Sequence, residues 1–448
     1  MITSRRTFAT ALTAASYDRV RGANDRVGVG FVGYGLIGAQ HVFDFKNQPD
    51  VDMVAVSDCY QPRLDQGSAA CGTRTKAFRD FRKMLEDKDV EAVVVSTPDH
   101  WHALITMMAC AAGKDVYVEK PLTLFVKEGR WMVQVARKHN RVVQVGTQQR
   151  SGPHYQKARD LIREGHIGKV VSVRMASNRN IMPGFGSPED STAPADFDYD
   201  MWLGPAPKRV FNKQRGIYHF RWFWDYSGGQ MTNLGAHSID IMQWCMDVNG
   251  PLAVSSSGGR FALPGPGDTP DIQDALYEYP GNFTASYSCR EVSQGPRGFG
   301  GGLDFHGTKG MLTIGRGGFE VVPDMRIDPE SAIPRFKGHP GGGPRAAGTK
   351  PEPWTKAIKE PGSSDEQFNL HLRNFIECIK TRKRPIADIE QGHQVTTACH
   401  LANISLRLGR KVRWDADKEQ IAGDREANAM LDRPYRKPWD AVLRSVLS

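Results

Sequence analysis

The sequence predicts an α/β protein with two domains, and three patterns support this fold class. An apolar run at 27–32 leads directly into the glycine-rich segment 33–38. Short apolar runs then alternate with helix-competent stretches as far as residue 148, which is typical of a doubly wound parallel sheet, the Rossmann arrangement. Beyond residue 148 the strands follow one another through hairpin turns. That change predicts a second, α+β domain with an antiparallel or mixed sheet.

The first domain is expected to span residues 26–148. Its strands are nearly continuous apolar runs, as buried parallel strands tend to be, and they are predicted at 27–32, 51–57, 90–97, 115–119 and 142–146. The helices between them are predicted at 39–46, 78–85, 102–112 and 124–139. Gly113 follows the third of these helices, and glycine at that place commonly ends a helix.

The second domain is expected to span residues 149–415. Its helices are predicted at 153–164, 232–246, 365–380 and 389–408. Its strands are predicted at 169–176, 274–279, 282–292, 302–306, 311–314 and 319–322. The stretches 178–226 and 334–363 are rich in Pro and Gly and are expected to be irregular, and the tail 416–448 is expected to form an extended strap.

Composition excludes several classes of function. The net charge of +9 is modest for 448 residues, and the basic residues do not gather with aromatic residues, so nucleic-acid binding is not expected. Seven cysteines without a C-x-x-C pair favour neither a disulfide framework nor a zinc ribbon. The His and Asp residues near position 100 lack a fourth ligand at a defined spacing, so no metal site is expected. No apolar run approaches the ~20 residues of a membrane span.

The first 25 residues form a separate segment. Ser4-Arg5-Arg6-Thr7-Phe8 is typical of a twin-arginine export signal, and a short run rich in Ala and Thr follows it. We therefore expect export to the periplasm in the folded state. Because the apolar run is weak and no clean cleavage site follows, an N-terminal arm on a cytoplasmic protein is the alternative.

The glycine-rich segment predicts a dinucleotide site. In Gly33-Tyr34-Gly35-Leu36-Ile37-Gly38 the first glycine allows a tight turn, the second allows a pyrophosphate to approach, and the third allows close packing of the following helix. The N–H groups of Leu36 and Ile37 lie just before that helix and are expected to bind phosphate. Asp58 ends the second predicted strand, 25 residues after Gly33 and near the ~20 expected for a ribose-binding carboxylate. Its charge would repel a 2′-phosphate, which favours NAD over NADP.

Three more polar segments follow predicted strands, at the edge where open α/β sheets bind ligands. They add Thr97, Pro98, His100, His102, Glu119, Lys120 and Gln148 to the predicted cofactor site. Lys120 stands between Glu119 and Pro121 at a strand end. Beside a bound nicotinamide, its amine can hydrogen-bond a reacting hydroxyl and stabilise a developing alkoxide. Loss of water around it would lower its pKa.

A fourth segment, 227–240, lies in the second domain. On a helix, Asn233 and His237 are four residues apart and share a face, and Asp240 follows His237 by three. A neutral imidazole between an amide and a carboxylate would be a general base with a pKa of about 6.5 when unperturbed. The alternative is a histidine of the core that bonds to the backbone.

Taken together, these segments resemble the glucose–fructose oxidoreductase/inositol dehydrogenase (Gfo/Idh/MocA) family. The shared marks are the turn at 33–38, the triplet 119–121 and the Gly-x-His-x-x-Asp helix that ends at Asp240, and the resemblance covers the chain after its leader. It implies a bound nicotinamide cofactor, sugar or polyol substrates, a large open sheet in the second domain, and a homodimer or homotetramer. It also implies that Lys120 contacts substrate and nicotinamide and that His237 is the acid/base.

Asn233 departs from the pattern of the family, because many members carry Asp at this position. An amide can orient a hydroxyl or the His237 ring, but it cannot accept a proton. Proton transfer would then depend on His237 together with Lys120.

Aromatic and charged residues of the irregular stretch 178–226 are expected to form the wall of the substrate site. Aromatic faces suit sugar C–H groups, and Arg and Asp suit hydroxyls. The residues assigned to substrate binding are Arg179, Tyr218, Arg221, Trp224 and Asp240. For Trp222 and Trp224, packing beneath the long loop is the alternative.

The sequence thus favours an NAD-dependent oxidoreductase that oxidises a secondary hydroxyl of a small carbohydrate. A second hypothesis is glycoside cleavage, in which transient oxidation acidifies a neighbouring C–H, elimination follows, and NAD is regenerated in place. A third is a dinucleotide-binding sensor without catalysis, which the presence of both Lys120 and His237 disfavours.

Overall fold

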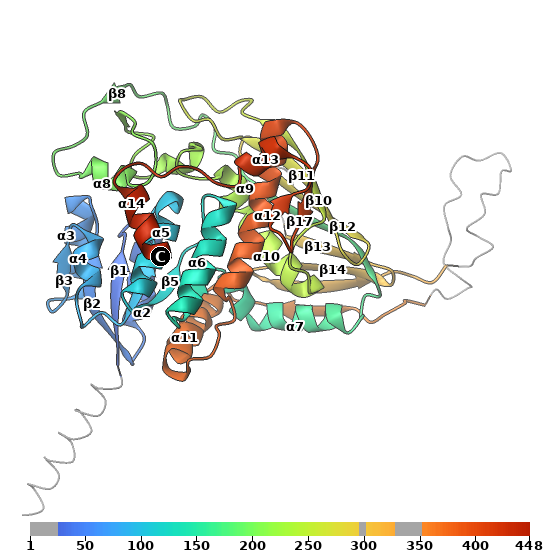
Figure 1. The fold of residues 1–448 in the computed structure, drawn as a ribbon. Coiled ribbons are helices and arrows are strands. Elements are labelled where there is room, and N and C mark those ends of the chain that lie inside the picture. Colours follow the sequence, from blue (N-terminus) through green and yellow to red (C-terminus); the bar gives the residue numbers. More distant parts are fainter. Residues whose placement is uncertain (1–25, 295–301, 328–351) are drawn as a thin grey trace, which may run out of the picture.

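The computed structural model describes residues 26–294, 302–327 and 352–448. The twin-arginine segment and most of the loop predicted at 334–363 lie outside these residues. Figure 1 shows the two predicted bodies side by side, with the chain entering the first sheet at β1 and ending on helix α14 beside it. No helix of the described residues is long and apolar enough to cross a membrane.

The first body is a parallel sheet of six strands in the order β3-β2-β1-β4-β5-β6, which is the doubly wound order of a Rossmann domain. Its strands are β1 Val27–Val32, β2 Val51–Ser57, β3 Lys76–Phe78, β4 Ala92–Val95, β5 Asp115–Val118 and β6 Val143–Val145. Its helices are α2 Leu36–Lys46, α3 Gln61–Cys71, α4 Phe81–Leu85, α5 Asp99–Ala111 and α6 Val126–Lys138. The Rossmann fold predicted for the first domain is therefore confirmed.

Two elements of this body differ from the prediction. Neither helix α3 nor strand β3 was predicted, and the helix predicted at 78–85 begins at Phe81 instead. Phe78 ends β3 beside Ser57 of β2, and the Asp80 side chain then caps α4 by accepting the Arg82 N–H at 2.9 Å. An aspartate cap marks a helix start that the apolar pattern alone did not show.

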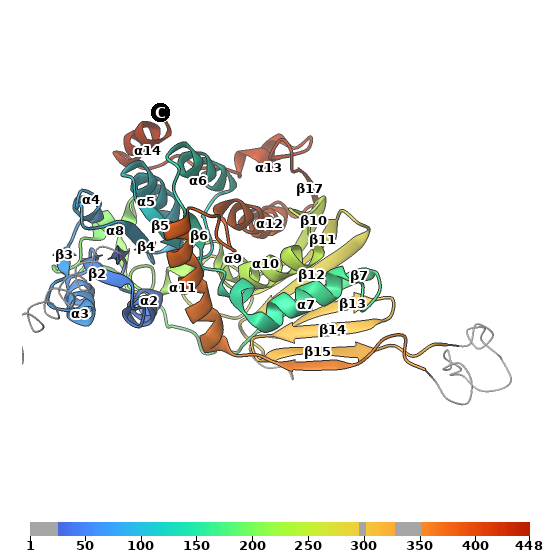
Figure 2. The ribbon, with the colours of Figure 1, turned by 90° about the horizontal axis from the view of Figure 1, so that it is seen from below.

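The second body is a mixed sheet of ten strands in the order β16-β15-β14-β13-β7-β12-β11-β10-β17-β18, in which β7 and β12 form the parallel pair. The strands are β7 Val170–Asn178, β10 Ala253–Gly259, β11 Ile272–Tyr279, β12 Phe283–Arg290, β13 Leu303–Gly307, β14 Gly310–Gly315, β15 Gly318–Pro323, β16 Ile358–Pro361, β17 Val412–Asp415 and β18 Gln420–Ile421. Figure 2 shows α7 Pro153–Arg163 and α10 Gly235–Met246 along one face of the sheet, with α12 Ile389–Leu408 nearby. Alternate strand residues, such as Tyr287 and Phe305, are buried there in one apolar cluster.

A third layer covers the carboxyl ends of the first sheet. It consists of the stretch predicted to be irregular and contains short elements: β8 Asp190–Ser191, α8 Tyr199–Leu203, β9 Phe211–Asn212 and η2 His219–Trp222. Figure 1 shows this segment above the strand ends. Its aromatic residues form their own core, which includes Phe197, Trp202 and Tyr226. The stretch is therefore an ordered cover over the place where a Rossmann sheet binds ligands.

The C-terminal part of the chain returns to the first body twice. Helix α11 Ser364–Thr381 places Phe375 in one cluster with Phe45 and Tyr117. The tail predicted as an extended strap instead contains α13 Arg425–Ala429 and α14 Trp439–Leu447. The Trp439 ring packs edge-on against Trp101 at 4.8 Å. The core of the first body is thus completed by residues far from it in the sequence.

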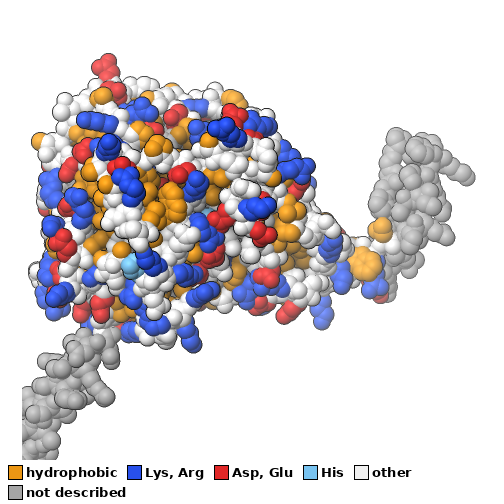
Figure 3. All heavy atoms as spheres, in the orientation of Figure 1, with side chains coloured by type: hydrophobic (Ala, Val, Ile, Leu, Met, Phe, Trp, Pro, Cys, Tyr) orange, Lys and Arg blue, Asp and Glu red, His pale blue; other side chains and the backbone are white. Residues whose placement is uncertain are grey.

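The charged residues of the surface are interspersed. Figure 3 shows Lys and Arg side chains among Asp and Glu on the visible face, without one large basic patch. All seven cysteines are unpaired, and six of them are buried. No cluster of His, Cys, Asp and Glu that could hold a metal occurs in the described ranges.

Candidate active site

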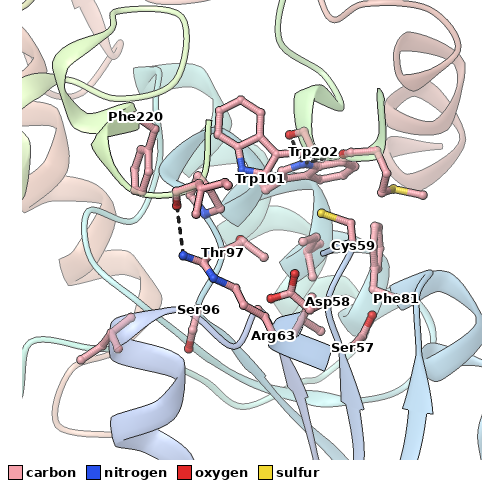
Figure 4. Close-up of a pocket in the computed structure, with 18 of the residues that line it drawn as sticks. Ser57, Asp58, Cys59, Arg63, Phe81, Ser96, Thr97, Trp101, Trp202 and Phe220 are labelled. Carbon is pink, nitrogen blue, oxygen red and sulfur yellow. Dashed lines mark hydrogen bonds between the residues drawn. The ribbon is translucent and has the colours of Figure 1, made fainter. Parts of the chain in front are cut away.

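A cleft separates the strand ends of the first sheet from the covering segment. Seven of the predicted cofactor residues line it: Gly33, Gly35, Leu36, Ile37, Asp58, Thr97 and Pro98. Tyr218 and Arg221, predicted for substrate, line its opposite wall. Figure 4 shows Asp58 and Arg63 near the strand ends and the rings of Trp101 and Trp202 across from them.

Each glycine of the turn has a distinct steric role. Gly33 has a φ of +90°, and a Cβ on Gly38 would stand 2.1 Å from the Gly33 carbonyl oxygen, so neither position accepts a side chain. Gly35 is different: a Cβ there would have an Arg63 nitrogen at 3.6 Å as its nearest neighbour, and the residue lines the cleft. No side chain caps α2, whose first N–H groups therefore remain available. The turn thus fits a dinucleotide pyrophosphate.

These contacts predict opposite outcomes for two alanine variants. Gly35→Ala should keep its melting temperature but lose at least about tenfold in NADH affinity, because the methyl group blocks approach to the helix N–H groups. Gly38→Ala should unfold at a lower temperature, because its methyl group collides with the backbone. Thermal melts and NADH fluorescence titrations measure both effects. Equal NADH affinity for Gly35→Ala and the unchanged protein would contradict this assignment of the turn.

Asp58 holds the end of β2 by backbone contacts. Its Oδ2 accepts the N–H of Tyr34 at 2.8 Å, and its Oδ1 accepts the N–H of Tyr60 at 2.9 Å. Burial raises the pKa of this carboxyl, while the two N–H donors and the Arg63 charge oppose the shift. Each carboxylate oxygen keeps a further lone pair for a ligand hydroxyl. Arg63 also spans the cleft, where it donates to the Ile217 carbonyl at 3.4 Å (Figure 4).

Lys120 and Asn233 meet at the edge of the cleft. The Lys120 ammonium donates to the Asn233 side-chain oxygen and to its main-chain carbonyl, each at 2.9 Å. Arg221, which lines the cleft, donates to the same side-chain oxygen at 3.4 Å. Burial together with the Arg221 charge lowers the pKa of Lys120 to about 8, against the opposing charge of Glu119. A lysine in this state can exchange a proton near neutral pH.

His237 lies in the first turn of α10, after a break in the helix. The prediction of one helix over 232–246 is wrong, because α9 Gly229–Asn233 ends before Leu234 and α10 begins at Gly235. His237 nevertheless lies close enough to Lys120 for the two charges to interact: burial and that charge lower the pKa of His237 well below its usual range. Its Nδ1 is buried without a hydrogen-bond partner among the described residues. The ring is therefore neutral at physiological pH.

Four predicted cofactor residues form a buried frame behind the cleft instead of lining it. His100 bonds to the Trp202 carbonyl at 2.9 Å, and the two His102 nitrogens bond to the carbonyls of Pro121 and Thr97. Glu119 bonds to His41 at 2.8 Å and accepts from Gln148 at 3.3 Å. All four side chains are buried and none lines the cleft, so they hold the surrounding loops in place, and a direct contact of each with the cofactor stays a prediction.

Comparison with known proteins decides the family. Residues 27–147 match the Gfo/Idh/MocA oxidoreductase family with its NAD-binding Rossmann fold, and residues 156–257 and 357–441 match the C-terminal α/β domain of the same family. The chain belongs to the Gfo/Idh/MocA family. The resemblance inferred from the motifs is therefore confirmed, and so is the nicotinamide-binding Rossmann domain.

Several Gfo/Idh/MocA relatives are similar to this chain. A scyllo-inositol 2-dehydrogenase (NAD(+)) of Bacillus subtilis (strain 168) is 23% identical over 86% of this chain and 96% of the relative. Inositol 2-dehydrogenase 1 of Saccharopolyspora erythraea is 34% identical, but the match covers 40% of this chain and 54% of the relative. Among solved structures, a levoglucosan dehydrogenase in complex with NADH and levoglucosan superposes with a TM-score of 0.66 at 18% identity, over 87% of this chain and 99% of that one. That likeness shows the shared fold.

One predicted substrate residue of this Gfo/Idh/MocA chain is an internal ion-pair partner. Both Asp240 oxygens accept the Arg150 Nε, at 3.0 and 2.9 Å, and both side chains are almost fully buried. The Arg150 guanidinium also lies over the Trp244 ring at 5.5 Å. Asp240 therefore faces the interior of the protein, and its assignment to substrate is corrected.

Two further residues assigned to substrate also lie outside the cleft. Arg179 forms an ion pair with the buried Glu291 at 2.6 Å, and neither lines the cleft. Trp224 lies beneath Arg407, whose guanidinium is 5.3 Å from its ring, in a separate small cavity. The alternative of packing beneath the long loop fits Trp222, which belongs to the aromatic core of that segment, whereas Trp224 packs against α12.

Several cleft residues were not predicted from the sequence. Arg63 and Arg79 flank Asp58, and the Phe81 and Trp101 rings form an apolar wall. Arg63 lies on α3, a helix without a clear apolar periodicity. Its position five residues after the ribose-type aspartate was the available signal.

Proposed function

We propose that this protein is a dehydrogenase that transfers a hydride between a secondary hydroxyl of a sugar or polyol and NAD. The observation that supports it is the Lys120 amine, held on Asn233 beside the glycine-turn cleft with a pKa of about 8. A nicotinamide bound in the cleft supplies the hydride acceptor. Membership of an NAD-binding oxidoreductase family and relatives that act on inositols agree with this activity.

Three residues of the chain then have separate roles in the reaction. The neutral amine of Lys120 accepts the proton of the reacting hydroxyl, and its ammonium form returns it in the reverse direction. His237, with its pKa held well below neutrality, remains an uncharged ring that hydrogen-bonds the substrate and orients it. Asn233 fixes the amine by two acceptors. The two catalytic residues come from different domains, so substrate must bind between them.

The experiment is a cofactor-resolved activity screen. Purified protein is mixed with NAD⁺ and a panel of inositols, aldoses and anhydrosugars, and NADH formation is followed by its absorbance. Stoichiometric NADH supports the dehydrogenase. Release of sugar from glycosides without added cofactor and without NADH would replace it with the glycoside-cleavage alternative. Binding of NADH with no turnover of either class would favour a sensor.

We propose NAD rather than NADP as the preferred cofactor, and Asp58 tests this. Asp58→Ser should raise KM for NAD⁺ about tenfold or more, because charge-assisted hydrogen bonds to ribose hydroxyls are lost. The same variant should improve use of NADP⁺, because Arg63 and Arg79 then face a 2′-phosphate without an opposing carboxylate. Steady-state kinetics with both cofactors give the ratio. A ratio unchanged from that of the parent protein would contradict the ribose assignment.

Two further proposals concern the protein in the cell. We propose export by the twin-arginine route, which carries folded, cofactor-loaded proteins, and an Arg5→Lys/Arg6→Lys variant should then remain in the cytoplasm in fractionation experiments. We also propose a homodimer or homotetramer, because the ten-stranded sheet offers a broad face. Light scattering after gel filtration measures the mass.

A further inference from the structure

We propose that the substrate of this site is an anionic sugar, one that carries a carboxylate or phosphate group, and that Arg221 recognises that group beside Lys120. This inference rests on the proposed dehydrogenase function and names its substrate class. It follows from a cluster of cations that surrounds neutral acceptors at the edge of the cleft.

The geometry of the cluster is centred on one amide. The Asn233 side-chain oxygen accepts from Lys120 at 2.9 Å and from Arg221 at 3.4 Å. The other acceptor of Lys120 is the main-chain carbonyl of Asn233, and Arg221 donates besides to the carbonyl of Tyr218 at 3.4 Å. All of these acceptors are uncharged. Two cations therefore meet on a single oxygen without a carboxylate between them.

The acidic residues nearby already have other partners. Glu119 is buried and bonds to His41 at 2.8 Å, and Asp99 is buried and accepts the Ser227 hydroxyl at 2.6 Å. Within the described ranges, neither Lys120 nor Arg221 forms an ion pair with a carboxylate. Arg150 is the contrast, because it binds both oxygens of Asp240. The buried Arg150 guanidinium thus has a carboxylate partner, whereas the cations at the cleft have only neutral acceptors in the described part of the chain.

A third cation reinforces the positive field. Arg316 lies in the turn between β14 and β15, where its carbonyl accepts from Gln367 and its guanidinium lies over the Phe368 ring at 5.8 Å. Besides burial, its charge contributes to the lowered pKa of both Lys120 and His237. Among the residues that the structure describes, Arg316 has no carboxylate partner.

Such a cluster favours a ligand that brings the missing negative charge. A guanidinium presents a planar set of donors that matches a carboxylate or a phosphate in two parallel hydrogen bonds. Arg221 lines the cavity and donates from Nε to Asn233 and from Nη1 to Tyr218, which leaves its Nη2 without a hydrogen-bond partner among the described residues. In the ammonium form of Lys120, a neutral sugar would leave the like charges of Lys120 and Arg221 without an opposing charge in a partly desolvated site.

The test uses the NAD-loaded protein and three substrates that differ at one carbon: D-glucose, D-glucuronate and D-glucose 6-phosphate, with D-galactose and D-galacturonate as a second pair. The inference predicts a kcat/KM at least about tenfold higher for an anionic member than for its neutral partner. The advantage should shrink as salt is added, because screening weakens the attraction. The uronate and phosphate arms identify which anion is recognised.

Variants then test the residues themselves. Asn233→Asp places a carboxylate between the two cations and should reduce the ratio of anionic to neutral kcat/KM by about tenfold. Arg221→Gln should reduce the same ratio mainly through KM for the anionic sugar. Arg209→Gln is the matched control, because it removes a guanidinium that pairs with Asp225 away from the cleft and should leave the ratio unchanged.

Two failures remain distinguishable. If neutral sugars are oxidised as well as or better than their anionic partners, the substrate inference is wrong and the dehydrogenase function stands. If no sugar reduces NAD⁺, the dehydrogenase function fails, and calorimetric binding of glucuronate against glucose to the NAD-loaded protein decides the charge preference. Equal binding of the two would overturn the inference.

Discussion

Replacing Lys120 by methionine is expected to lower kcat by about a thousandfold, within the roughly 10²–10⁴-fold range of general acid–base catalysis. Methionine keeps the length and much of the volume of the side chain but cannot exchange a proton. NADH affinity should be unchanged, because the amine lies at the edge of the cleft and its contacts are with Asn233. Stopped-flow reduction of NAD⁺ and a fluorescence titration separate the two quantities.

The pH dependence carries a second signature of Lys120. Oxidation of a hydroxyl needs the neutral amine, and a pKa of about 8 means that the neutral fraction increases as pH rises toward 8. The rate should therefore rise roughly tenfold per pH unit below that value and level off above it. The methionine variant should lose this limb. Lys120→Arg is the control for charge, since its guanidinium stays protonated. A pH profile that keeps the same limb in Lys120→Met would assign the proton to another group.

Asp240→Ala is expected to cost about 3–5 kcal/mol in the free energy of unfolding, because it leaves the buried Arg150 guanidinium without its counter-charge. Denaturant titration measures the loss. The double variant Arg150→Met/Asp240→Leu should recover most of it, since replacing both ions with apolar residues is often nearly neutral.

The same experiment separates structure from substrate binding. Had Asp240 contacted the sugar, as its spacing from His237 suggested, the single variant would raise KM and leave stability nearly intact. The structure predicts the reverse: a less stable protein whose folded fraction keeps its KM.

Elements with a strong local signal were predictable from the sequence. The strand at 27–32 and the glycine turn carry their pattern within a dozen residues, and both lie where expected. Strand β10 has the sequence Ala-Val-Ser-Ser-Ser-Gly-Gly, in which no apolar alternation survives, and it forms because β11 pairs along its whole length. Helix α10 was placed too early, since the break at Leu234 depends on how the chain packs and not on propensity.

The site was predictable to the extent that topology alone brings residues together. Strand ends converge at one edge of a parallel sheet, so the turn, Asp58 and Thr97 could be placed in a common cleft. Helical spacing predicts which residues share a face, but it does not predict which part of the protein that face packs against. His100 and Asp240 therefore looked like ligands of a cleft, whereas tertiary packing turned one to the Trp202 carbonyl and the other to Arg150.

Because the C-terminal part of the chain packs on the first body, the first domain can complete its core only late in synthesis. Phe375 and Trp439 belong to the apolar clusters around the first sheet, so the nascent Rossmann segment leaves the ribosome with part of its core still to be made. The completed domain can then bind its nucleotide only after nearly the whole polypeptide has been synthesised. Under the twin-arginine export proposed above, release from the cytoplasm would then require the C-terminal helix to be made and packed first.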